Sequence, residues 1–235
     1  MGQTARDVVV RMNRAQRHRG PDDQGVASCT FESGEVILGN TRLAIIDTSS
    51  AGHQPMRDQQ TGNWITYNGE TYNFKHLRHE VDQEPWISNT DTEVVLRAYG
   101  KYGIDAFRKL RGMFALAIWD DQKRTLLLAR DPLGIKPLYY YAAQQHFIFA
   151  SELRALLASG LVPHKLSTAG VDSYLANGSV EAPLTIIDGI KQLLPGHCLQ
   201  VKVNDAGSIE LSDVEFAFPK PPALTGNRDD AVERL

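Results

Sequence analysis

The stretch "MFALAIWDDQKRTLLLARD" (residues 113–131) decides the fold, because it predicts two neighbouring strands joined by a polar turn. The runs 113–119 and 125–129 are almost continuously apolar and do not alternate with polar residues. Such runs are typical of strands that are covered on both faces. The sheet that contains them therefore needs a further layer of structure on each side.

Strand-like sequence continues on both sides of this hairpin, and helical segments surround it. The strand-like runs are "VASCTF" (26–31), "EVILGN" (35–40), "TRLAIID" (41–47), "GNWITYNG" (62–69), "KPLYYYAAQQHFIFAS" (136–151) and "GHCLQVKV" (196–203). The first helical segment carries Val8, Met12 and Ala15 on one side. The other helical segments are residues 73–81, 90–103, 152–160 and 167–178. Successive strands favour a sheet packed on a sheet with helices outside over an alternating βαβ design.

The composition and net charge of the chain limit the kinds of partner that it is expected to bind. The chain has 235 residues, 42% of them hydrophobic and 23% charged, which is typical of a soluble globular protein. Its apolar runs are far shorter than a membrane span, and a net charge of -3 argues against a dedicated nucleic-acid binder. We therefore expect neither a membrane nor a nucleic acid as partner.

The two cysteines, Cys29 and Cys198, lie far apart in apparent strands, and neither has a neighbour at metal-ligand spacing. We expect reduced thiols in a cytoplasmic protein and no metal site.

The character of the sequence changes after Val203. The segment "FPKPPALTGNRDD" (218–230) is rich in proline and polar residues, which is typical of a linker. "DDAVERL" (229–235) has the pattern of another helix. We therefore predict one domain over residues 1–203, followed by a linker and the start of a further helix over 204–235.

The segment "YNGETYN" (67–73) carries the most informative polar residues. Taken alone, Asn68 and Gly69 predict a turn, because both residue types tolerate positive φ. The alternative is an oxyanion hole, in which an Asn amide and a Gly backbone N–H hold a developing alkoxide. Glu70 follows directly and is suited to bind a substrate ammonium group.

Two further residues complement this segment. Arg42 lies between two strand-like runs and is suited to a bidentate grip on a carboxylate. Asp91 lies at the start of a helix, where it interacts with the first turn or holds a cationic amine. Together with residues 68–70, they predict a site that binds a free amino acid by its carboxylate, its reacting carbonyl and its ammonium group.

An ordered series of segments closely resembles a known family. The segments are "HRGPDD" (18–23), "TRLAIIDTSSAGHQPM" (41–56), "YNGETYN" (67–73), "TDTEVVLRAYGKYG" (90–103), "LRGMFALAIWD" (110–120), "ARDPLGIKPLYY" (129–140), "FASELRALL" (149–157) and "LPGH" (194–197). Over residues 8–203 the chain resembles the N-terminal glutaminase domain of glutamine-hydrolysing asparagine synthetases. These are class II glutamine amidotransferases with the N-terminal-nucleophile hydrolase fold. "RDDAVERL" (228–235) resembles the first helix of their ATP-dependent synthetase domain.

The resemblance implies an α+β fold, a four-layer α/β/β/α sandwich, and a pocket for L-glutamine. It assigns Asn68 and Gly69 to the oxyanion hole, and the remaining pocket residues to substrate binding: Arg42, Leu43, Ala44, Ile45, Ile46, Glu70 and Asp91. It implies no cofactor in this domain. ATP and Mg²⁺ belong to the covalently linked synthetase domain, and a homodimer is also expected.

The chain departs from the family at the nucleophile. In that family a cysteine follows the initiator Met, and its own α-amine acts as general base. Here the second residue is Gly2, and neither Cys29 nor Cys198 lies in a matching motif. We therefore expect that the first strand is missing and that this chain alone is inactive.

Two alternatives stay open. One is a degenerate amidotransferase module that serves as a structural or docking domain. The other is a sugar-phosphate or purine-pathway amidotransferase, which "ARDPLGIKPLYY" (129–140) alone would also fit.

Overall fold

Antiparallel strands dominate the computed structural model, which describes residues 4–31, 34–81, 85–204 and 208–217. The strands are β1 (Asp23–Phe31), β2 (Gly34–Arg42), β3 (Met56–Arg57), β4 (Trp64–Thr71), β5 (Gly112–Asp120), β6 (Thr125–Arg130), β7 (Tyr139–Ala142), β8 (Phe147–Ala150), β9 (Ile190–Gln192), β10 (His197–Val203) and β11 (Ile209–Glu215). They form a six-stranded sheet in the order β11-β10-β6-β5-β4-β3, a pair β1-β2, and a three-stranded sheet β8-β7-β9.

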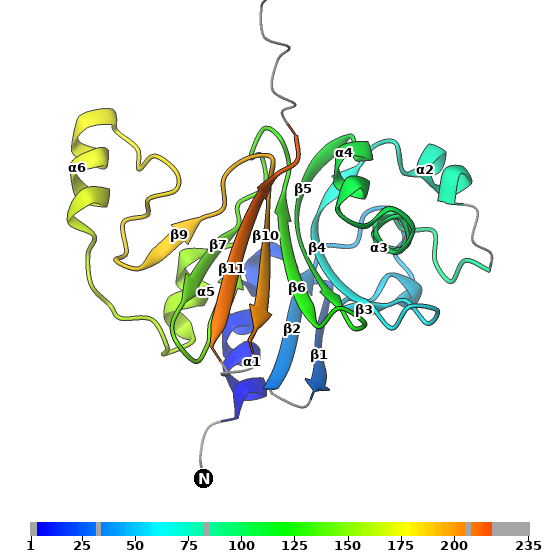
Figure 1. The fold of residues 1–235 in the computed structure, drawn as a ribbon, viewed down its shortest axis with the longest axis horizontal. Helices are drawn as coiled ribbons and strands as arrows, with labels where there is room; N and C mark the ends of the chain where they lie inside the picture. The colour runs from blue at the N-terminus through cyan, green and yellow to red at the C-terminus, as the bar shows by residue number, and fades with distance from the viewer. Residues whose placement is uncertain (1–3, 32–33, 82–84, 205–207, 218–235) are drawn as a thin grey trace, which may run out of the picture.

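Helices lie outside these sheets. They are α1 (Ala5–Ala15), α2 (Phe74–Val81), α3 (Asp91–Tyr102), α4 (Ala106–Lys109), α5 (Leu153–Ala158) and α6 (Thr168–Asn177), with 3-10 turns at Arg17–Arg19, Ser50–Gly52 and Gly103–Asp105. Figure 1 shows α2, α3 and α4 on one side of the six-stranded sheet and α1 and α5 on the other. The predicted α+β class and the four-layer α/β/β/α arrangement are confirmed.

Three hydrophobic clusters fill the spaces between the four layers. The first packs the six-stranded sheet against α2, α3 and α4, and Leu96 and Phe107 are fully buried in it. The second lies between the sheets and includes Leu38 of β2 and Trp119 of β5. The third lies under α1 and α5 and includes Met12. Each layer therefore buries its apolar face against the next, which is how stacked sheets gain stability from hydrophobic burial.

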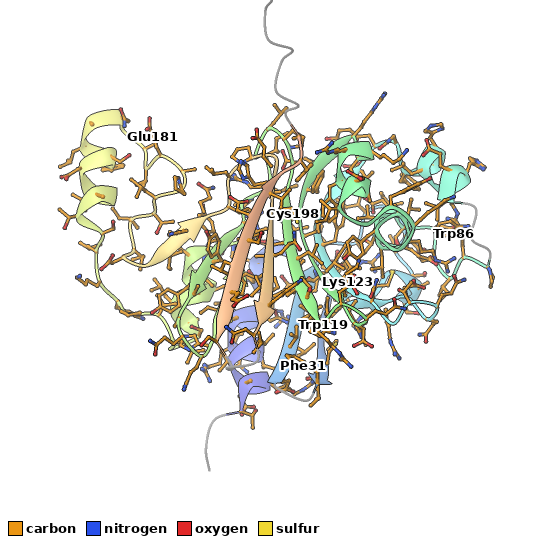
Figure 2. All side chains as sticks on the ribbon, viewed as in Figure 1. Phe31, Trp86, Trp119, Lys123, Glu181 and Cys198 are labelled. Atoms are coloured by element: carbon orange, nitrogen blue, oxygen red, sulfur yellow. The ribbon has the colours of Figure 1, made fainter. Side chains whose placement is uncertain are left out.

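The hairpin predicted at residues 113–131 forms the centre of the large sheet. β5 pairs with β6 around a polar turn, and β4 and β10 pair with their outer edges. Every residue of β6, and β5 from Phe114 on, is buried, as the continuous apolar runs predicted. Phe31 stacks on Trp119 with ring centroids 5.2 Å apart, which joins β1 to this hairpin (Figure 2).

The loop after β6 is fixed by the buried carboxylate of Asp131. Asp131 is fully buried and accepts hydrogen bonds from the backbone N–H groups of Phe114, Leu133, Ile135 and Lys136. A carboxylate that satisfies several backbone donors removes the desolvation cost that each would otherwise carry. This loop is therefore held against the start of β5.

Regular structure continues beyond the predicted end at Val203. Residues 209–215 form β11, which pairs antiparallel with β10, and Phe216 is buried against Phe107 and Phe114. Most side chains of β11 are exposed and polar, because it is the edge strand of the sheet. That composition carries no strand signal, so the sequence alone predicts a linker there. The segments 218–230 and 229–235, predicted as a linker and a new helix, lie outside the described residues.

Candidate functional site

A cavity of about 840 Å³ brings the predicted binding residues together. Arg42 ends β2, Asn68 to Glu70 lie in β4, and Asp91 begins α3. Of the predicted set, the following line this cavity: Arg42, Leu43, Ile45, Ile46, Asn68, Gly69, Glu70 and Asp91. Ala44 does not line it, and its backbone N–H donates to Asp22 at 2.9 Å.

Asn68 and Gly69 do not form the turn that their sequence allowed. β4 continues through both residues, with Asn68 opposite Ala115 and Gly69 opposite Phe114 on β5. A Cβ on Gly69 would lie 2.3 Å from the carbonyl oxygen of Met113, so only glycine fits this close approach.

The side chain of Asn68 is held by a residue that the sequence did not single out. Its Nδ2 donates to Oγ of Ser151 at 3.3 Å, directly after β8. An amide fixed in this way keeps a second N–H for a ligand, which suits an oxyanion donor. The segment "FASELRALL" contained Ser151, but no pattern in one sequence linked it to Asn68 across 83 residues.

Arg42 is nearly buried at 9% exposure, and backbone carbonyls orient its guanidinium. It donates to the carbonyl oxygens of Ser49, at 3.2 Å, and of Asp47. A Cβ on Gly52 would lie 2.0 Å from its Nη2 atom, so the turn closes directly over the guanidinium. This cation is therefore fixed in place at the cavity wall, where a carboxylate would meet it.

Asp91 is 5% exposed and accepts two hydrogen bonds through Oδ2. The donors are the Tyr67 hydroxyl at 3.1 Å and the Thr71 N–H at 2.8 Å. Burial raises the pKa of Asp91 above its ordinary value, although both hydrogen bonds oppose that shift. A buried carboxylate at a cavity wall is suited to bind a cation that replaces the lost water.

A buried polar network supports this wall, and sequence reasoning missed it. Gln54 accepts from the Tyr67 N–H at 2.7 Å and from the Asn40 side chain at 3.3 Å, and it donates to Thr92 at 3.3 Å. Asn40 also donates to Thr66 at 3.0 Å. The network ties β2 to β4 and α3. In the sequence, these polar residues only stand at the ends of apolar runs. That pattern does not show which of them hydrogen-bond to one another.

Neither cysteine contributes to the cavity lining. Burial raises the pKa of Cys29 to about 11 and that of Cys198, which lies in β10 (Figure 2), to about 12. Thiols with such pKa values are protonated at neutral pH and are weak nucleophiles.

Within the described ranges, no three His, Cys, Asp or Glu side chains form a group that would hold a metal ion. In the same ranges, no helix has the length and apolar character needed to cross a membrane.

A sequence profile of the Glutamine amidotransferase domain family matches residues 1–210. The chain belongs to this family. The resemblance that the sequence motifs carried is thereby confirmed at the level of a class II glutamine amidotransferase domain.

Curated relatives extend this assignment. Asparagine synthetase [glutamine-hydrolyzing] 1 of Bacillus subtilis is 38% identical over 225 residues, which cover 94% of this chain and 34% of that protein. Putative asparagine synthetase [glutamine-hydrolyzing] 2 of Methanocaldococcus jannaschii is 38% identical over 197 residues, covering 77% of this chain and 38% of that protein. The amidotransferase domain thus spans little more than a third of these relatives.

A relative with a different name also matches. Amidase chry2 of Gibberella zeae is 35% identical over 189 residues, which cover 80% of this chain and 27% of that protein. Among solved structures, glutamine phosphoribosylpyrophosphate amidotransferase from B. subtilis has a TM-score of 0.65 at 19% identity, covering 92% of this chain and 48% of that chain. This likeness concerns the fold alone.

Proposed function

We propose that this amidotransferase domain binds L-glutamine and serves as the glutaminase part of a glutamine-hydrolysing asparagine synthetase. The observation that supports this most is the convergence of Arg42, Asn68 and Asp91 on one cavity. Arg42 binds the substrate carboxylate, Asp91 and Glu70 bind its ammonium group, and Leu43, Ile45 and Ile46 line the pocket beside them.

The proposed reaction converts glutamine and water to glutamate and ammonia. The thiol of an N-terminal cysteine, as in the family that the chain resembles, attacks the side-chain amide carbon of glutamine. The Asn68 amide and the Gly69 N–H hold the tetrahedral oxyanion that forms. The cysteine's α-amine passes the thiol proton to the amide nitrogen, which departs as ammonia, and a thioester remains. Water then hydrolyses the thioester and regenerates the thiol. Each oxyanion donor contributes about 3 kcal/mol to transition-state stabilisation.

We further propose that this chain by itself does not turn over glutamine. The described residues bring no thiol to Asn68, since Cys29 and Cys198 lie elsewhere with raised pKa values. The test is glutamate release by the purified chain, compared with a boiled sample. Release above the boiled control contradicts this proposal.

The rival is a module that has lost catalysis and acts as a structural or docking domain. It predicts that L-glutamine does not bind, whereas our proposal predicts saturable binding that depends on Arg42. The genomic sequence upstream provides a second test, because an in-frame Met-Cys-Gly supports the glutaminase and its absence supports the rival.

In the whole protein, a linked synthetase domain would use ATP and Mg²⁺ to make a β-aspartyl-AMP intermediate, and the ammonia would react with it. We propose that this enzyme is cytoplasmic and homodimeric. We propose that ATP and Mg²⁺ bind in the linked domain and not in this one. Reading the gene downstream for S-G-G-x-D-S tests the linkage.

A further inference from the structure

A second cavity, of about 390 Å³, lies beside β3, the edge strand of the large sheet on the side of α3 (Figure 1). We call it the β3 cavity. β1 lines it with Val26 and Ala27, β3 with Met56 and Arg57, and α3 with Leu96. It shares no lining residue with the cavity that holds the proposed glutamine pocket. Its volume is at the lower end of the range for cavities that bind small molecules.

The walls of the β3 cavity are suited to a flat apolar group. Trp64 of β4 is half-buried and lines the cavity together with Met56 and Leu96. Aromatic rings stack favourably on an indole face, and a methionine sulfur adds a favourable contact. Ile87 also lines the cavity and is 61% exposed, so a ligand that covers it removes apolar surface from water.

Arg57 is a cation with an unused hydrogen-bonding face. It is exposed, and its Cζ lies 5.9 Å from the centroid of the Trp64 ring. The guanidiniums of Arg78 and Arg97 lie closer to the ring of Trp86 (Figure 2), at 4.4 and 4.5 Å. In the part of the chain that the structure describes, no carboxylate pairs with Arg57. Its planar fork of N–H donors therefore remains available to a ligand carboxylate.

The other charged groups of the lining already have partners. Glu93 and Arg97 form an ion pair at 2.7 Å, and each side chain is 5% exposed. Nδ1 of His53 lies 2.7 Å from a carboxylate oxygen of Asp23. The Asp58 carboxylate accepts from a backbone N–H at 3.1 Å and from a hydroxyl at 2.6 Å within its own turn. The charge that the lining offers to a ligand is therefore the positive charge of Arg57.

We propose that the β3 cavity is a second ligand site, which binds a small aromatic carboxylate with its ring against Trp64 and its carboxylate on Arg57. A cavity of this volume suits one ring or two fused rings with a short acidic group. A protein partner fits less well. Among the large apolar side chains that are exposed in the described residues, Ile87 alone lines this cavity, so no broad apolar surface surrounds it.

The β3 cavity lies behind one wall of the proposed glutamine pocket. His53 and Pro55 line the β3 cavity, whereas Gln54 between them lines the other cavity and donates to Thr92 at 3.3 Å. In α3, Thr92 lines the glutamine side and the next residue, Glu93, lines the β3 cavity. We therefore expect the two ligands to change each other's affinity by the same factor. This coupling rests on the proposed function, whereas the aromatic-acid site does not.

The experiment is calorimetric titration of the purified 235-residue chain with indole-3-acetate, indole-3-acetamide and acetate. We expect saturable binding of indole-3-acetate with a dissociation constant of about 1 mM or below, and binding at least about tenfold weaker for the other two. Arg57→Gln should weaken indole-3-acetate binding by about tenfold or more. The matched control is Arg108→Gln, at an arginine that is 58% exposed and pairs with Asp105. Arg42→Ala should bind indole-3-acetate normally, because Arg42 lies in the other cavity.

Four outcomes would overturn the proposed site: no binding of indole-3-acetate up to about 10 mM, equal binding of the acetamide, normal binding by Arg57→Gln, or binding lost in Arg42→Ala. Sedimentation of the chain as a dimer that Ile87→Glu dissociates would instead assign the cavity to an interface between two copies.

The coupling is measured by titrating L-glutamine with and without saturating indole-3-acetate. We expect the dissociation constant of L-glutamine to change by about threefold or more. An unchanged constant would overturn the coupling alone. If L-glutamine does not bind while indole-3-acetate does, the proposed function fails and the second site stands, so the two failures are distinguishable.

Discussion

Gly52 lies directly over the guanidinium of Arg42, where a Cβ would be 2.0 Å from Nη2. The contact explains how a long, flexible side chain is kept in one orientation at the cavity wall. It also separates the position of Arg42 from its charge, because Gly52 can be changed without altering any residue that contacts substrate.

Gly52→Ala is expected to weaken L-glutamine binding roughly tenfold or more, because displacing the guanidinium loses a charge-assisted, bidentate contact. The end of an arginine moves easily, so the melting temperature should change little. Isothermal titration with L-glutamine checks this. The matched control is Gly100→Ala in α3, where the new Cβ meets only Thr61 at 3.4 Å. If Gly52→Ala bound L-glutamine with unchanged affinity, Arg42 would not be a glutamine-binding residue.

Asp91→Asn is expected to separate stability from binding. The raised pKa of Asp91 means that its carboxylate is less stable in the folded chain than in the unfolded one. Its favourable contribution is complete below the unfolded pKa and is lost as pH rises through the folded pKa. At pH 7 the variant should therefore be as stable as the parent or more stable, since Asn still accepts from Tyr67 and Thr71.

The same variant should bind L-glutamine about 10 to 100 times more weakly, because a charged acceptor for the ammonium group is lost. Thermal melting at pH 4 and pH 7 and titration calorimetry measure the two effects, with the exposed Asp105→Asn as control. A variant that melts earlier at pH 7 and binds normally would show that Asp91 is a structural residue.

The two thiols are expected to react slowly with a thiol reagent at pH 7.5, because burial raises both pKa values to about 11 and about 12. The half-buried Cys29 should react before the buried Cys198. Cys29→Ser and Cys198→Ala should leave glutamine binding unchanged. Rapid labelling of either thiol that glutamine prevents would place it in the pocket.

Asp131→Ala is expected to lower the free energy of unfolding by at least about 3 kcal/mol, because it leaves four backbone N–H groups without their acceptor. Urea denaturation measures this. Asp188→Ala, on the surface, serves as control and should lie within about 0.5 kcal/mol of the parent. A neutral result for Asp131→Ala would mean that this loop is not held by the carboxylate.

The sequence predicted the parts of the fold that have a local signal. The continuous apolar runs 113–119 and 125–129 predicted strands covered on both faces, and β5 and β6 are buried as expected. The pattern of residues 90–103 predicted a helix, and α3 forms there with Thr90 as its N-cap, which accepts from the Glu93 N–H. The Glu93 carboxylate accepts from the N–H groups of Ile87 and Ser88.

The features that the sequence did not predict depend on distant parts of the chain. β11 is a polar edge strand whose pairing with β10 has no local signature. Asn68 and Gly69, which taken alone predict a turn, instead continue β4, because their conformation depends on pairing with β5. Ser151 and Gln54 acquire their roles only when β8 and α3 approach β4.

The measurement that tests the central claim most directly is calorimetric titration of this chain with L-glutamine, D-glutamine and L-glutamate. The account predicts saturable binding of L-glutamine alone, at no more than millimolar concentration, and its loss in Arg42→Ala. No binding of L-glutamine up to about 10 mM, or equal binding by parent and Arg42→Ala, would contradict the account.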